Sequence, residues 1–226
     1  MIGFFDYTTL LTYLSLISAV VGTVVSLSGA GHPFIGAFFL LFCGLCDAFD
    51  GKVARTKTNR TEREKNYGIQ IDSLSDLVAF GVLPGCIGAA MYRRLTLSQG
   101  NALHEDYNIL VYTIIALYAL AALIRLAYFN VTEMERQQEE GGARKTYTGL
   151  PVTSSALIFP TILLVHYLLD RDITPVYLAA MLITAFAFLS KFKVIKPGLR
   201  GILIMIGIGL VECIILIIFL SVRGII

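Results

Sequence analysis

The chain has 226 residues, of which 56% are hydrophobic and only 15% are charged. With a mean hydropathy of +0.75, it is too apolar for a soluble domain, and it lacks the long polar stretches that would indicate a second domain. The formal net charge of +2 is too small to indicate the nature of a partner. Several apolar runs approach the roughly 20 residues that cross a bilayer. The sequence therefore predicts an all-α, polytopic membrane protein with a single integral membrane domain over residues 1–226.

Seven transmembrane helices are expected along the chain. The predicted ranges are 8–28, 33–55, 68 to about 92, 107–129, 152–169, 175–190 and 201–222. The first six form a bundle over about residues 8–190, and the seventh is an additional C-terminal helix over about 201–222. The polar segments 93–106 and 130–148 are predicted as loops. Pro84 and the glycines around it allow a kink and close helix packing in the third helix.

Basic residues predict how the bundle is oriented in the cell membrane. They gather in the loops after the second, fourth and sixth predicted helices, whereas Arg93 and Arg94 lie on the opposite side. The basic residues of the three loops are Lys52, Arg55, Lys57, Arg60, Arg63 and Lys65, then Arg136, Arg144 and Lys145, then Lys191, Lys193, Lys196 and Arg200. Because cytoplasmic loops carry an excess of Lys and Arg, the N-terminus is predicted inside and the C-terminus outside.

Four aspartates lie in segments that otherwise have the composition of membrane helices. Asp47 and Asp50 are three residues apart, and Asp72 and Asp76 are four apart, so each pair shares one face of a helix. Carboxylates at membrane depth are costly and indicate a cation site or a proton path. A salt-bridge cluster with Lys52 and Arg55 is the alternative, but two cations do not neutralise four carboxylates. Oxygen ligands favour Mg²⁺, Mn²⁺ or Ca²⁺ over Zn²⁺.

Small residues accompany both aspartate pairs. Gly51 and Ala54 fall on the same side of the helix as Asp47, and Arg55 follows at the end. Gly68 lies in a row with Asp72 and Asp76 on the second helix. If the two faces oppose each other, four carboxylates surround one cavity near the cytoplasmic leaflet.

The resulting pattern, D-x2-D-G-x2-A-R followed by G-x3-D-x3-D, resembles the signature of the CDP-alcohol phosphatidyltransferase family. Eight positions carry the resemblance: Asp47, Asp50, Gly51, Ala54, Arg55, Gly68, Asp72 and Asp76. Twelve residues separate Arg55 from Gly68, about one helical turn more than is usual in the family. An insertion of that length keeps the aspartates on the cavity but leaves the path of residues 56–67 open.

The resemblance implies a phosphoryl transfer from CDP-diacylglycerol, with CMP as the leaving group and two divalent cations, Mg²⁺ or Mn²⁺. It implies that Asp47 and Asp72 bridge both cations, that Asp50 and Asp76 complete one site each, and that Asp76 is also the general base. The donor-binding residues are predicted to be Gly51, Ala54, Arg55, Gly68, Thr12, Arg144 and Lys145. The implied partners are CDP-diacylglycerol, membrane lipid and a second copy of the chain in a homodimer, with no nucleic acid.

A second stretch predicts the acceptor. The pattern R-L-x2-F-N at residues 125–130, followed by G-L-P at residues 149–151, is similar to the bacterial and archaeal phosphatidylserine synthases of the family. The resemblance implies L-serine as the acceptor, bound by Arg125, Asn130 and Thr153. Each residue also has a structural interpretation. Arg125 could extend to the lipid head groups, Asn130 could cap a helix, and Thr153 could bond its own helix backbone. Gly149 and Pro151 are expected to shape the turn before the fifth helix.

Two other functions compete with this one. Glycerol 3-phosphate or an inositol phosphate could be the acceptor, but these dianions should need several cations, and Arg125 is the obvious one in the predicted pocket. A cation transporter would also place carboxylates in membrane helices. The chain shows no inverted repeat, and Arg55 stands beside the aspartates, which both disfavour transport.

Overall fold

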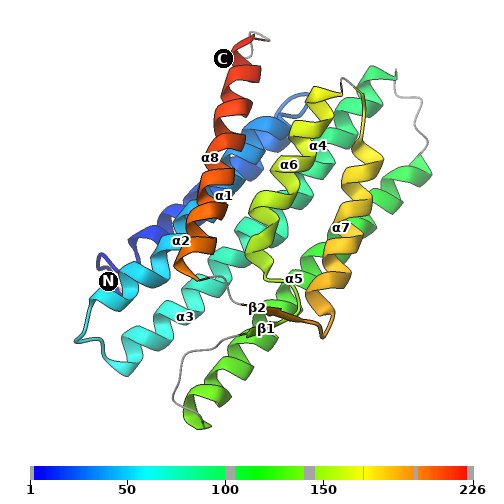
Figure 1. Ribbon diagram of the computed structural model, residues 1–226. Helices are drawn as coiled ribbons and strands as arrows, with labels where there is room; N and C mark the ends of the chain where they lie inside the picture. The colour runs from blue at the N-terminus through cyan, green and yellow to red at the C-terminus, as the bar shows by residue number, and fades with distance from the viewer. Residues whose placement is uncertain (1–2, 100–104, 140–145, 170, 196–197, 223–226) are drawn as a thin grey trace.

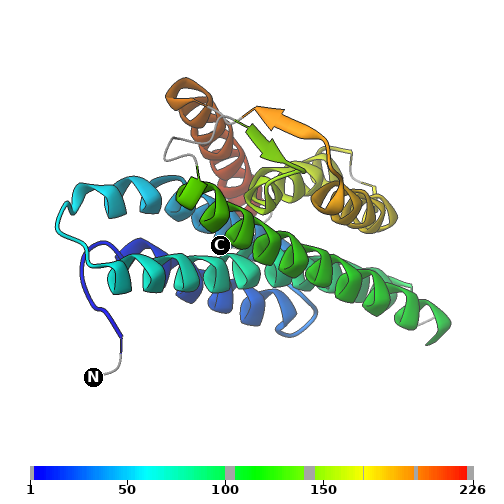
Figure 2. The same cartoon turned by 90° about the horizontal axis from the view of Figure 1, so that it is seen from below.

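The structure is a computed structural model that describes residues 3–99, 105–139, 146–169, 171–195 and 198–222 (Figure 1). Helices dominate it, which confirms the predicted all-α membrane bundle. The helices are α1 (Leu10–Leu27), α2 (Pro33–Thr56), α3 (Glu62–Asp76), the π-helix η1 (Leu77–Val82), α4 (Leu83–Ser98), α5 (Glu105–Glu139), the 3-10 helix η2 (Val152–Ser154), α6 (Ser155–Leu168), α7 (Thr174–Leu189) and α8 (Leu199–Val222). Two short strands, β1 (Thr146–Thr148) and β2 (Lys193–Ile195), pair antiparallel beside the ends of α6 and α7 (Figure 2).

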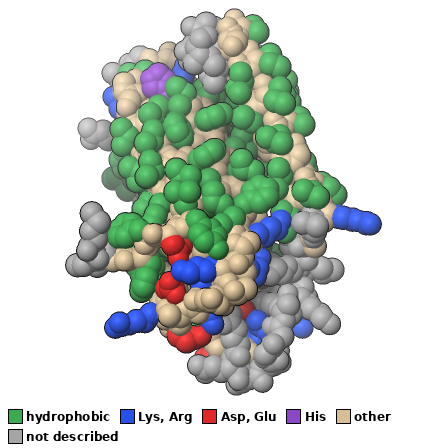
Figure 3. Space-filling model, turned by 90° about the vertical axis from the view of Figure 1, so that its left-hand side faces the viewer, with side chains coloured by type: hydrophobic (Ala, Val, Ile, Leu, Met, Phe, Trp, Pro, Cys, Tyr) green, Lys and Arg blue, Asp and Glu red, His purple; other side chains and the backbone are tan. Residues whose placement is uncertain are grey.

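Five helical stretches in the described residues are long and apolar enough to cross a membrane. They are Leu10–Leu27, Pro33–Thr56, Glu62–Ser98, Tyr107–Arg136 and Arg200–Ile218. The shorter helices α6 and α7 are also apolar. Hydrophobic side chains form a broad band on the face shown in Figure 3, and acidic and basic side chains gather below that band. The α2–α3 connection and the two strands lie at the same end as the N-terminus, and the C-terminus lies at the opposite end (Figure 1).

The helix that carries Asp72 begins at Glu62, six residues before the predicted start. Thr61 caps it: the Thr61 hydroxyl accepts a hydrogen bond from the Glu64 backbone N–H, at 3.2 Å. The Glu64 carboxylate in turn accepts one from the Thr61 backbone N–H, at 2.7 Å. This capping box satisfies two donors at the helix start. The extra residues of the 56–67 segment therefore lengthen α3 rather than form only a loop.

Two other helices also extend beyond their predicted ends. Helix α5 continues ten residues past Phe129 to Glu139, into the segment predicted as a loop. The added turns contain several good helix formers, and Arg136 donates to Glu133 three residues earlier, at 2.6 Å. Helix α4 likewise continues to Ser98 instead of ending near residue 92. The predicted helices end too early because the prediction stopped where the apolar run meets charged residues. Charged residues such as Lys, Arg and Glu nevertheless continue a helix readily.

The kink expected near Pro84 takes the form of the π-helix η1, which directly follows Asp76. Proline lacks a backbone N–H, so the carbonyl of Phe80, four residues before Pro84, loses its α-helical partner. The Tyr118 hydroxyl on α5 donates to that carbonyl at 2.7 Å. The Tyr177 hydroxyl on α7 donates to the Pro84 carbonyl at 2.9 Å. Two buried tyrosines therefore fix the irregular turn next to Asp76.

Helix α2 lies at the centre of the bundle, in contact with α1, α4, α6 and α8. It packs tightly against α6 at Gly44, where a Cβ atom would lie 2.6 Å from the Ala156 Cβ. Small residues at such crossings let helix backbones approach closely in membranes. This contact fixes α2 against α6 less than one turn before Asp47 and less than two turns before Asp50.

We expect Gly44→Ala to lower the melting temperature in detergent by about 5 °C, because overpacking a tight contact costs about 1–3 kcal/mol. Gly207→Ala on α8 is the matched control, since no described atom lies within 4 Å of its added Cβ. A thermal unfolding assay of both variants checks this. Equal melting temperatures for the two variants would contradict the close α2–α6 contact.

Candidate metal and substrate site

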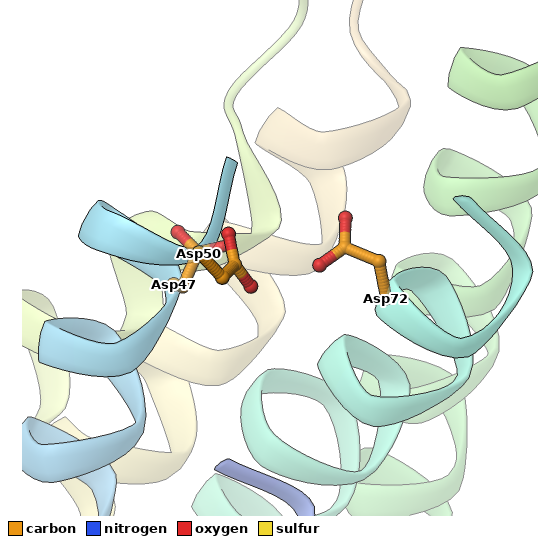
Figure 4. A group of neighbouring side chains, drawn as sticks. All are labelled: Asp47, Asp50 and Asp72. Carbon is orange, nitrogen blue, oxygen red and sulfur yellow. The ribbon is translucent and has the colours of Figure 1, made fainter. Parts of the chain in front are cut away.

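Three carboxylates converge between two helices. Asp47 and Asp50 come from α2 and Asp72 comes from α3, and one oxygen of each lies within 4.8 Å of the others. Figure 4 shows the two α2 carboxylates facing Asp72 across the gap between the helices. The pairing of residues three apart on α2 places both carboxylates on the side that faces α3. The aspartate faces of the two helices thus oppose each other.

Asp76 follows one turn after Asp72 and is the last residue of α3 before the π-helix. Its side chain is buried, with 8% exposed. It is not one of the three residues whose oxygens meet within 4.8 Å. The structure therefore brings three of the four predicted carboxylates into one cluster. The roles of Asp76 as a metal ligand and as a general base stay predictions.

The cluster suits a hard divalent cation. Its three potential ligands are all carboxylates, and Mg²⁺, Mn²⁺ and Ca²⁺ prefer oxygen ligands. Both helices belong to stretches that can span a membrane, where three uncompensated negative charges in contact would repel strongly. A bound cation removes that repulsion.

The small residues of the signature lie on the same two helices as the cluster. A Cβ atom on Gly51 would lie 3.6 Å from Nη1 of the exposed Arg55, and Ala54 is half-buried. Thr12 on α1 is buried, and its carbonyl accepts a hydrogen bond from the Ser75 hydroxyl at 3.2 Å. That contact places Thr12 against α3 at Ser75, a residue that lies between Asp72 and Asp76 in the chain. Arg144 and Lys145 lie outside the described residues.

Sequence reasoning missed the contacts made by the α2–α3 connection. Lys57 donates to Asp6 at 2.6 Å and to Glu64 at 2.8 Å, so it ties the N-terminal segment to the start of α3. The hydrogen bond from Lys57, helped by those from Thr8, lowers the pKa of Asp6 to about 2. The same two carboxylates raise the pKa of Lys57, with Asp6 the larger influence. Lys57 is therefore charged, and its ammonium group is paired with carboxylates of the protein.

Gly68 is also covered by a basic residue. A Cβ atom at Gly68 would lie 2.6 Å from Nη2 of Arg60, a residue of the α2–α3 connection. Arg60 in turn donates from Nη2 to the Glu64 carbonyl at 3.1 Å. The sequence predicted Arg60 only as one of several basic residues in a cytoplasmic loop. The T-x2-E pattern at residues 61–64 was the signal that could have shown where the loop ends and the helix begins.

Of the predicted acceptor residues, Arg125 and Asn130 lie on α5 and Thr153 lies on η2. Asn130 donates from Nδ2 to the hydroxyl of Ser73 at 2.8 Å, directly beside Asp72 in the chain. Because α5 continues to Glu139, Asn130 does not cap this helix. Arg125 is buried, with 6% exposed, so its side chain does not extend to the lipid surface. Its Nε donates to the Leu150 carbonyl at 3.2 Å, and its guanidinium lies 5.6 Å from the Phe129 ring centre.

The G-L-P turn shapes the wall that Arg125 contacts. Gly149 has a φ of +75°, and a Cβ atom there would lie 2.7 Å from the Ser190 carbonyl oxygen. Only glycine fits both conditions. Pro151 immediately precedes η2, which contains the half-buried Thr153. Gly149 and Pro151 thus have the structural roles that were expected.

Comparison with known sequences identifies the class of protein. The family model of the CDP-alcohol phosphatidyltransferases matches residues 7–192, so the chain belongs to this family. Helix α8 lies beyond the matched residues. No solved structure gave a significant match.

Individual relatives are similar over most of the chain. A CDP-diacylglycerol–serine O-phosphatidyltransferase of Saccharomyces cerevisiae is 33% identical over 157 residues, which are 68% of this chain and 51% of that protein. One of Helicobacter pylori is 27% identical over 192 residues, covering 80% and 72%. An archaetidylserine synthase of Methanothermobacter thermautotrophicus is 28% identical over 195 residues, covering 85% and 70%. The matched part of the chain spans about half the length of the yeast relative.

We expect Asp72→Asn to weaken Mn²⁺ binding by at least about 100-fold, because it removes a charged ligand and leaves the side-chain shape unchanged. Asp6→Asn is the control, since Asp6 lies outside the cluster and is bound to Lys57. Titration of the purified protein with Mn²⁺, followed by electron paramagnetic resonance of the free ion, measures both affinities. Unchanged binding in Asp72→Asn would remove this residue from the metal site.

Proposed function

We propose that the protein transfers the phosphatidyl group of CDP-diacylglycerol to the hydroxyl of L-serine, which gives phosphatidylserine and CMP. The convergence of Asp47, Asp50 and Asp72 within 4.8 Å carries this proposal. The family supplies the donor class, and the names of the similar proteins support serine as the acceptor. The proposed catalytic domain is a single one, with its core over about residues 8–190.

Two divalent cations, Mg²⁺ or Mn²⁺, would neutralise the charge that develops on the diphosphate. In the proposal Asp47 and Asp72 would be ligands of both cations, Asp50 would complete one site and Asp76 the other. Asp76 also accepts the proton of the serine hydroxyl. The serine oxygen then forms a bond to the phosphorus that carries diacylglycerol, and the bond from that phosphorus to the CMP oxygen breaks. CMP leaves with the electron pair of that bond.

The two substrates are proposed to meet between α2, α3 and α5. Arg55 binds the donor's phosphates. The faces of α2 and α3 that carry only small residues, at Gly51, Ala54 and Gly68, let the nucleotide approach the helix backbones. Thr12, Arg144 and Lys145 complete the proposed donor set. Arg125 pairs with the serine carboxylate through its planar guanidinium, and Asn130 and Thr153 orient the amino acid. Burial of Arg125 supports this role, because a desolvated guanidinium holds a carboxylate more strongly than an exposed one.

The site is proposed to face the cytoplasm. The α2–α3 connection, with its basic residues, lies at the same end of the bundle as the N-terminus (Figure 1). By the positive-inside rule this end is cytoplasmic, so a water-soluble acceptor and a lipid donor meet at one surface. We also propose that the protein forms a homodimer. Light scattering of the detergent-solubilised protein would measure its molar mass and so its oligomeric state.

Release of CMP from CDP-diacylglycerol tests the proposed reaction. We expect the purified protein with Mn²⁺ or Mg²⁺ to release CMP with L-serine, and not with glycerol 3-phosphate or inositol phosphate. Asp72→Asn serves as the inactive control in the same assay. Release with a phosphorylated acceptor alone would replace serine as the substrate. No release with any acceptor, from a folded sample, would favour cation transport.

Arg125→Gln tests the acceptor site. We expect the KM for serine to rise about tenfold while the KM for CDP-diacylglycerol changes less than twofold, because the lost hydrogen bond is charge-assisted. Steady-state kinetics with each substrate varied in turn measures the two constants. Arg136→Gln, which removes a guanidinium paired with Glu133 further along α5, is the control. An equal rise in both constants would move Arg125 to the donor site.

A further inference from the structure

The two glycines of the signature share a feature that the sequence does not show. Each is covered by a guanidinium. Nη1 of Arg55 lies 3.6 Å from the Cβ position of Gly51 on α2, and Nη2 of Arg60 lies 2.6 Å from that of Gly68 on α3. Arg55 belongs to the signature, whereas Arg60 lies in the longer spacer between the two halves. The spacer thus adds a second arginine to the small-residue side of the site.

Arg60 is held in place by the ordered start of α3. It immediately precedes Thr61, the cap of the helix, and its Nη2 donates to the Glu64 carbonyl at 3.1 Å. Lys57 fixes the other side of the connection through Asp6 and Glu64. Gly68 lies one helical turn before Asp72, so the guanidinium over it lies about one turn along α3 from the Asp72 side of the cluster.

The charge of Arg60 is not compensated within the described residues. The neighbouring basic residues Lys57 and Lys65 are paired with carboxylates, and no described ion pair includes Arg55 or Arg60. The Arg60 Nε is buried and has no hydrogen-bond partner among the described residues. A guanidinium has five donors, and a buried donor without a partner is unfavourable. Positive charge with unused donors, next to a glycine, fits an anionic ligand.

We propose that Arg60 is a further donor-binding residue, whose guanidinium binds the diphosphate of the CDP-linked lipid from the α3 side while Arg55 binds it from the α2 side. The fork of an arginine matches two phosphate oxygens at once. Gly68 is then required because a side chain there would displace the Arg60 guanidinium. This inference rests on the proposed function only for the class of donor, and it holds for any acceptor.

Arg60→Gln tests the inference against Arg63→Gln, which makes the same change at an exposed residue of the same segment. We expect Arg60→Gln to raise the KM for CDP-diacylglycerol about tenfold and to leave the KM for serine within twofold. Arg63→Gln should leave both constants within twofold. A KM for CDP-diacylglycerol within twofold of the unmodified protein, or an equal rise in both constants, would overturn the proposal.

A binding measurement separates this inference from the proposed reaction and from a loss of stability. We expect CDP, which carries the diphosphate, to raise the melting temperature of the unmodified protein and of Arg63→Gln in the presence of Mn²⁺, and to raise that of Arg60→Gln much less. Arg60→Lys, which keeps the charge without the fork, should give an intermediate shift. If the unmodified protein shows no activity with serine but this order of shifts holds, the proposed acceptor fails and Arg60 remains a donor residue. Equal shifts in all four proteins would remove Arg60 from the donor site.

Discussion

Three carboxylates that meet within 4.8 Å between membrane-spanning helices constrain the rest of this structure. Their repulsion is strong where water is scarce, so a bound cation would stabilise the cluster, and the scaffold must keep α2 and α3 from separating. The scaffold is visible at Gly44, where α2 lies directly against α6, and at Ser75, which bonds the backbone of α1. Packing forces thus hold together groups that electrostatics alone would push apart.

The π-helix after Asp76 has a related role. A proline in the following turn frees the Phe80 carbonyl, and Tyr118 satisfies it from α5. Tyr177 contacts the Pro84 carbonyl from α7. Both hydroxyls are buried and each bonds a specific carbonyl, so these contacts stabilise the irregular turn. The position of Asp76 therefore depends on helices that carry no aspartate of the cluster, and the bundle beyond α2 and α3 supports the site.

Basic residues of the α2–α3 connection divide into two kinds. Lys57 and Lys65 are bound to carboxylates of the protein, and they fix the N-terminal segment and the start of α3. Arg55 and Arg60 instead lie over Gly51 and Gly68. Counting positive charges in the sequence gives no means to separate these groups, because the distinction depends on which carboxylates the folded chain brings near. The longer spacer between Arg55 and Gly68 matters because it contains Arg60, one of the two arginines that lie over a glycine.

The sequence by itself determined the membrane bundle and the pairing of its aspartates, because apolar length and spacing along a helix are local properties. It also contained the T-x2-E cap that starts α3 early, although the charged residues there suggested a loop. The tertiary structure decided which carboxylates meet, that Asn130 bonds Ser73, and that Arg60 covers Gly68. The contacts to Asn130 and among the carboxylates join residues distant in the chain, and that of Arg60 needs the connection to fold back on α3. Their existence depends on how the helices pack and not on any local pattern.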